Sequence, residues 1–251
     1  MIAMTSAAEL LLRTQNAAAL ARPRYAAAAV RIVVFGVPIL IAIDLGLHAV
    51  NGSTTLTSWW LGDVSLAVLL AVPGVLVALK RQLNAIGWLL CAASFSTALS
   101  GAGREYLIDG CCGGIAPGHR VIGWFTDSSY MLSMTTLPLT LMVFPDGRPM
   151  SRRARWLLAL PLGCMTLGVF GSMFYKGSAV DIRGRLLRNP TDGVLPQWLP
   201  ETAMSVSTVL FFASIIAAIV VLLVRYRRSS GDVRLKMKWV GWAGEFGVIE
   251  M

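Results

Sequence analysis

The sequence predicts an all-α protein, a polytopic bundle of transmembrane helices with about six spans and both termini in the cytoplasm. Three observations predict this class. The 251 residues are 56% hydrophobic and only 14% charged, whereas a soluble domain carries about 25% charge. The mean hydropathy of +0.67 excludes a disordered chain. The apolar residues also gather in long continuous runs, whereas a membrane β-barrel would show short alternating segments.

Six apolar stretches are long enough, or nearly so, to cross a hydrocarbon layer about 30 Å thick. They are residues 32–50, 59–79, 85–101, 121–144, 156–175 and 203–224. The fourth contains Asp127 and Pro138, so we expect a tilted or kinked helix there. The chain therefore divides into a cytoplasmic Ala-rich tail (1–31), a six-span membrane domain (32–226) and a basic juxtamembrane tail (227–251). This last tail either stays outside the membrane or begins a truncated seventh span.

The distribution of basic residues predicts the orientation. With a cytoplasmic N-terminus, most of the 22 Lys and Arg residues fall on the inner side, notably in residues 80–81, 148–155 and 225–238. Basic loops stay in the cytoplasm, so we expect the plasma membrane as the location and the lipid bilayer, with its anionic head groups, as a partner. No soluble basic face with interleaved aromatic residues is present, so nucleic acid is not an expected partner.

Ionisable side chains in or beside the spans are the candidate sensing residues, because each is costly in hydrocarbon. All lie toward the predicted outer side, and the acids within the spans would be roughly 6–9 Å below the membrane boundary. These candidates are Asp44, His48, Asp63, Asp127, Arg104 and Glu105. Asp44 and His48 have i,i+4 spacing, so the carboxylate is able to hold the imidazole. One interpretation is an outward-facing pocket for a cation, a proton or a small ligand. The other is that these groups are hydrated near the head groups and pair with Arg104 or Arg120.

A polar face of hydroxyl residues runs along the fourth span at 4,3,4 spacing. It consists of Ser129, Ser133, Thr136 and Thr140. These side chains either line a path for a ligand or make contacts between helices. Small residues at four- or near-four-residue spacing in the third and fifth spans predict faces for close helix packing. They are Ala92, Ser96 and Ser100, and Gly163, Gly168 and Gly171.

The cysteines and the enzyme motifs say little about catalysis. Cys111 and Cys112 are adjacent in an outer loop and are redox candidates, because the cell exterior is oxidising. With His119 they lack the usual spacing of metal ligands, so we expect no metal. Phosphate-binding loops, HExxH, GxSxG and GxGxxG are missing from the sequence. We therefore expect neither a cofactor nor a cytoplasmic active site.

Three segments, taken in order, resemble one family. Residues 84–90 (NAIGWLL) resemble its NPIGWLL start of a membrane helix, and residues 144–153 (FPDGRPMSRR) resemble its FPDGRLPSRRW hairpin. Residues 231–239 (GDVRLKMKW) resemble its G-x-x-R-x-Q-L-K-W stretch. The segments are similar to the multi-pass N-terminal regions of actinobacterial sensor histidine kinases, the class partnered with LuxR-type response regulators. Ala85 stands where the family usually has proline, and Met237 where it has leucine.

The resemblance implies an integral membrane sensor, the signal-input module of a two-component-type histidine kinase. The kinase half is not expected in this chain, because the phosphoacceptor histidine and the ATP-binding boxes have no counterparts. The chain is then a fragment, a disrupted gene product or a free-standing relative. A homodimer, and a cytoplasmic kinase half or response regulator as partner, are also implied. The alternatives are a small transporter or permease component that uses the same acids, and a structural membrane subunit.

Overall fold

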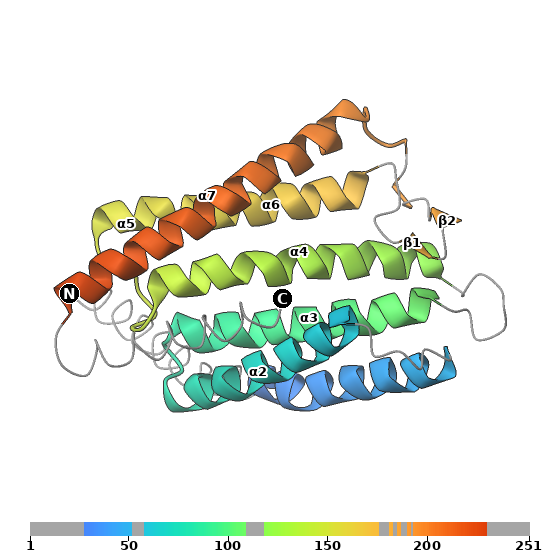
Figure 1. The fold of residues 1–251 in the computed structure, drawn as a ribbon, viewed down its shortest axis with the longest axis horizontal. Helices are drawn as coiled ribbons and strands as arrows, with labels where there is room; N and C mark the ends of the chain where they lie inside the picture. Colours follow the sequence, from blue (N-terminus) through green and yellow to red (C-terminus); the bar gives the residue numbers. More distant parts are fainter. Residues whose placement is uncertain are drawn as a thin grey trace, which may run out of the picture.

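The protein is a bundle of long helices lying side by side along one axis (Figure 1). A computed structural model describes residues 28–51, 58–108, 118–175, 181–182, 185–186, 190–191 and 193–229. After a first helix, Ala28–Val50, the elements are α2 (Ser58–Lys80), α3 (Ala85–Ile108), α4 (His119–Val143), α5 (Arg152–Leu157), α6 (Ala159–Phe174), β1 (Asp181–Ile182), β2 (Arg185–Leu186) and α7 (Trp198–Arg228). The two short strands pair antiparallel before α7. The predicted all-helical bundle is confirmed.

Five of the described segments are helical, long and apolar enough to cross a membrane. They are Ala28–Val50, Leu61–Lys80, Ala85–Leu107, Arg152–Phe174 and Trp198–Arg228. Large apolar side chains such as Phe35, Leu69 and Val209 are more than half exposed on the first helix, α2 and α7. Such faces are stable when hydrocarbon rather than water surrounds them. The chain is therefore a membrane protein.

The remaining long helix, α4, lies in the middle of the bundle and is more polar than the others. It packs against α3, α6 and α7, and most of its hydroxyl side chains are buried against these neighbours. Its polar groups are thus shielded from lipid, which explains how a helix of 25 residues fits among apolar spans without being apolar throughout. The helix continues through Pro138.

Three helix boundaries differ from the sequence expectation. We expected the third span to end at residue 101, before Arg104 and Glu105, but α3 continues to Ile108, because both charged side chains find partners on other helices. We expected one helix over 156–175, but it is divided at Leu158 into α5 and α6. Pro161 has no N–H to donate to the carbonyl of residue 157, where α5 ends. Finally, α7 runs through the predicted start of the basic tail to Arg228.

The turns after α2 and α4 and the end of α7 lie at one end of the bundle, on the left in Figure 1, which we call the basic end. Asn84 accepts a hydrogen bond from the Ile86 N–H at 2.9 Å and so caps α3. Gly147 has a φ of 73°, and a carbon added to it would overlap the Asn84 side chain. On the other side, Arg225 of α7 donates to the carbonyl of Arg148 at 2.9 Å. The hairpin thus joins the start of α3 to the end of α7.

Candidate functional site

At the opposite end of the bundle, polar side chains tie the first helix to α3. Nδ1 of His48 lies 3.1 Å from Oε1 of Glu105. Asn51 donates from Nδ2 to Oε2 of Glu105 at 2.9 Å and to the Glu105 carbonyl at 3.0 Å. His48 and Glu105 are both buried. One carboxylate therefore binds a side chain near the end of the first helix and one just after it, which fixes the end of this helix against α3.

Arg104, one residue earlier on α3, connects α3 to α2 and α4. Its Nη1 donates to Oδ2 of Asp63 at 3.2 Å. Its guanidinium carbon also lies 4.8 Å from the ring centroid of Tyr130 on α4, a distance at which a cation is attracted to an aromatic face. Asp127 on α4 is within Coulombic reach of the same guanidinium. A single cation thus holds three helices together.

Asp44 completes this group, which we call the charged cluster (Asp44, His48, Asn51, Asp63, Arg104, Glu105 and Asp127). Only 2% of Asp44 is exposed. A carbon added to Gly101 of α3 would lie 3.7 Å from Oδ2 of Asp44 and 3.8 Å from Cβ of Asp63. These are ordinary van der Waals distances, so Asp44 and Asp63 both lie close to this turn of α3.

The charged cluster contains more acid than base. Four carboxyl groups, on Asp44, Asp63, Glu105 and Asp127, face one arginine and one histidine. In a low-dielectric setting such an excess attracts protons or cations. No group of His, Cys, Asp or Glu side chains within the described residues has the geometry to hold a metal ion. The arrangement suits the binding of a proton or of a small cationic ligand.

All six ionisable candidates named from the sequence are thus brought together from four helices. Arg104 and Glu105, which we expected just after a span, lie inside α3. Arg104 does pair with an acid, as the second interpretation required, whereas Arg120 is exposed. Sequence reasoning missed Asn51 and Tyr130. Asn51 was detectable, because it follows His48 by three positions and so shares its helix face.

The polar face of α4 is buried, and much of it makes contacts within the bundle. Ser129, Ser133, Thr136 and Thr140 are each less than 10% exposed. Oγ of Ser133 lies 2.5 Å from Oγ1 of Thr97 on α3. Thr136 and Thr140 donate to carbonyls of their own helix. The sequence left two uses for this face, a ligand path or contacts between helices. The Ser133–Thr97 bond is a contact between helices.

We expect Ser133→Ala to lower the free energy of unfolding by about 0.6 kcal/mol, the usual worth of an interhelical hydrogen bond in a membrane. Ser65→Ala is the matched control, because the exposed Ser65 hydroxyl bonds only to its own helix. Denaturation of the protein in mixed micelles, followed by circular dichroism, measures both. Equal effects of the two substitutions would contradict an interhelical role.

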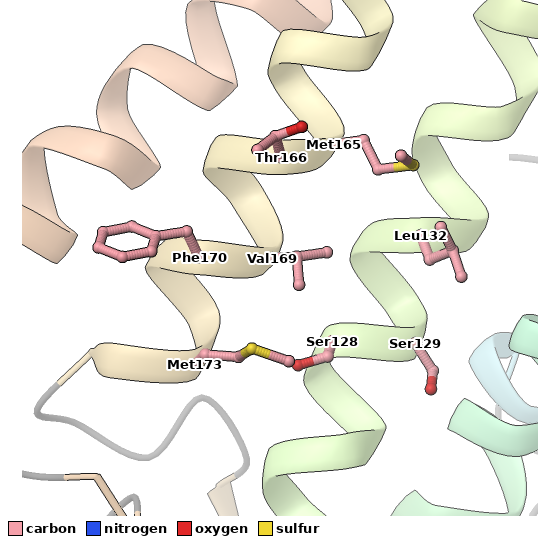
Figure 2. A pocket seen from close by; sticks show the side chains of 8 residues that line it. All are labelled: Ser128, Ser129, Leu132, Met165, Thr166, Val169, Phe170 and Met173. Carbon is pink, nitrogen blue, oxygen red and sulfur yellow. The ribbon is translucent and has the colours of Figure 1, made fainter.

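A cavity of about 480 Å³ lies between α4 and α6 (Figure 2). It is lined by Ser128, Ser129, Leu132, Met165, Thr166, Val169, Phe170 and Met173. In Figure 2 the side chains of Met165 and Val169 point toward α4, whereas that of Phe170 points away from it. The walls are almost entirely apolar, and the Ser128 hydroxyl donates to the carbonyl of Trp124 at 2.9 Å. This cavity is largely open to its surroundings and contains no member of the charged cluster.

The small-residue face of α6 packs closely, as expected, whereas Ala92 of the face predicted on α3 is exposed. A carbon added to Gly168 would lie 2.8 Å from the Ser207 hydroxyl of α7, and one added to Gly171 would lie 2.6 Å from Met204. Ser207 also donates to the carbonyl of Cys164 at 2.9 Å. Cys91 and Cys164 are buried free thiols within helices. The redox candidates Cys111 and Cys112 lie outside the described residues.

Comparison with known proteins adds no relative. No family model matches the chain, and neither the curated proteins nor the solved structures include a match.

Proposed function

We propose that the chain is the signal-input region of a two-component-type sensor histidine kinase and that the charged cluster receives the stimulus. The observation that carries this proposal is the convergence of four helices on one set of ionisable groups. A change in charge or occupancy there alters contacts of the first helix, α2, α3 and α4 together. A switch between two helix packings requires one event that shifts several helices together, and a contact shared by four helices allows this.

The route for such a signal is provided by α3 and α4, which reach both ends of the bundle. The last turns of α3 carry Arg104 and Glu105, and its start is capped by Asn84. Asp127 lies near the start of α4, and the hairpin that follows α4 contacts both Asn84 and Arg225. A displacement at the charged cluster would therefore reach the end of α7. Under this proposal a catalytic partner responds to that movement.

The family-like segments also support the proposal. Residues 84–90 and 144–153, which resemble sensor kinases in sequence, meet at the basic end through Asn84 and Gly147. The third segment, residues 231–239, lies outside the described residues. We further propose that the basic end faces the cytoplasm across the plasma membrane. The proposed partners are a second copy of the chain and a kinase half or response regulator.

The proposal is tested by fusing the full chain to a histidine kinase catalytic half and measuring autophosphorylation. Asp127→Asn and Asp44→Asn should each change the basal rate by about fivefold or more, the usual lower range of coupling between sites. Glu201→Gln is the matched control, because this exposed residue lies on α7 outside the cluster. Yield in the membrane fraction shows whether insertion is intact. Unchanged output from both Asp variants would contradict the proposal and favour a structural subunit.

The excess of carboxylates supports a second candidate, a permease that couples transport to a proton or cation. Transporters usually place such groups at the membrane midplane, between internal repeats. Here the cluster lies toward the end of the bundle where the first helix and α3 end and α2 and α4 begin, which favours the sensor. Proteoliposomes loaded with a pH-sensitive dye separate the two functions. Proton flux that Asp127→Asn abolishes would identify a permease, whereas the sensor should show none.

A further inference from the structure

Arg225 is an unusually buried arginine at the basic end of the bundle. It lies in the last turn of α7, and only 7% of it is exposed. Its Nη2 donates to the backbone carbonyl of Arg148 at 2.9 Å. The two terminal nitrogens of a guanidinium belong to one rigid planar fork. Nη1 therefore faces the same region between α7 and the hairpin.

Nη1 of Arg225 is also shielded from solvent, and no group among the described residues accepts its hydrogen bonds. Asp146 is within Coulombic reach, but it is exposed and makes no ion pair with Arg225. A buried donor without an acceptor is costly, and more so when it is charged. Among the described residues, therefore, Nη1 has no anionic acceptor.

The surroundings of Arg225 are strongly basic. Exposed arginines on the hairpin, α5 and α7 lie at the same end, and α5 packs against α7. They are Arg148, Arg152, Arg153, Arg155, Arg227 and Arg228. Asp146 is the one acid among the described side chains there. A phosphate group has several strong acceptor oxygens and fits the arginine fork, so it is able to bridge Nη1 and the exposed arginines.

We propose that the basic end binds a phosphate group, carried by an anionic lipid or free in solution, with Arg225 as its buried partner. The site lies between residues 146–153 and the last turn of α7. Phosphate-bearing lipids collect at basic pockets between helices on the cytoplasmic side of membranes. This site is separate from the charged cluster, and phosphate binding there does not rest on the signalling proposal.

Native mass spectrometry of the full chain in neutral detergent tests the proposal. Three probes are titrated separately: phosphatidic acid, diacylglycerol with the same acyl chains, and inorganic phosphate. Phosphatidic acid should bind and diacylglycerol should not. If inorganic phosphate binds with the same dependence on Arg225, the natural source is free phosphate; if only phosphatidic acid binds, the source is a lipid. Binding of neither phosphate-bearing probe, or equal binding of diacylglycerol, would overturn the proposal.

Variants of the full chain localise the site. Arg225→Gln should weaken phosphate binding about tenfold, because it removes a charged hydrogen bond. Arg227→Gln on the same helix end should weaken it only about twofold, as expected for an exposed charge. An equal loss in the two variants would assign the binding to general surface charge and overturn the proposal.

Asp146→Asn provides a second test in which Arg225 and the turn remain intact, since asparagine suits a turn as well as aspartate does. Removing this carboxylate relieves its repulsion of the phosphate, so affinity for phosphatidic acid should rise several-fold. Weaker binding by Asp146→Asn would show that Asp146 supports the site rather than competing with the phosphate, and would overturn the proposal.

Discussion

Replacing Glu105 with alanine is expected to lower the free energy of unfolding by about 2–3 kcal/mol, because one buried and one partly buried contact lose their acceptor. His48 of the first helix and Asn51, just after its end, both bind this one carboxylate. Its removal takes away the acceptor that His48 and Asn51 share, while Asn51 still donates to the backbone carbonyl of residue 105. Unfolding of the full chain in mixed micelles, monitored by circular dichroism, measures the loss.

Glu201→Ala is the control for this substitution. The exposed Glu201 side chain bonds with Gln197, the residue before α7, so its loss should change stability by less than about 0.5 kcal/mol. Equal destabilisation by the two alanine variants would mean that Glu105 contributes nothing through the first helix. A Glu105→Gln variant should fall between wild type and Glu105→Ala, since its amide oxygen still accepts one bond.

A comparably large effect is expected from Gly87→Ala, at the close contact between α2 and α3. The added carbon would lie 2.6 Å from the backbone nitrogen of Ala78 and 3.0 Å from its Cα. Backbone atoms of a facing helix are unable to rotate away as a side chain does. We expect a loss of about 2–3 kcal/mol in the free energy of unfolding, typical of overpacking.

Gly46→Ala is the matched control for Gly87→Ala, because it makes the same chemical change within another helix. Nothing lies within 4 Å of a carbon added at Gly46. Alanine favours helix over glycine by about 1 kcal/mol, so this variant should be neutral or slightly stabilised in the same assay. Similar losses for both glycines would contradict the close approach of α2 and α3.

The helices were predictable because a segment that crosses hydrocarbon must be long and almost entirely apolar. Residues 203–224 carry no charge, so they are stable only inside a membrane or buried in protein. α7 contains this run in full. Boundaries were less predictable where charge occurs. The sequence expectation ended the third span before Arg104, since a lone charge is costly in lipid. That cost is offset by Asp63 and Tyr130, which lie on other helices.

The candidate site was predictable in its members but not in its pairings. Ionisable residues within apolar runs are easily noticed, because placing them in hydrocarbon costs free energy that a function or a partner must offset. Asp44, His48 and Asp127 are such residues. Spacing along one helix suggested Asp44 beside His48, but it gives no information on a contact between His48 and Glu105, which are 57 positions apart. The buried state of Arg225 was also hidden, because in the sequence it is one of several arginines at a span end.

The central position of α4 has a consequence for how the protein is made. Its hydroxyl side chains face α3 on one side, through Ser133 and Thr97, and α6 on another, where Ser128 lies 3.4 Å from Ser172. When the ribosome has just produced α4, α3 is already available, but α6 and α7 have not been synthesised. The translocation machinery must therefore retain this helix beside α3 until the C-terminal helices emerge and enclose it.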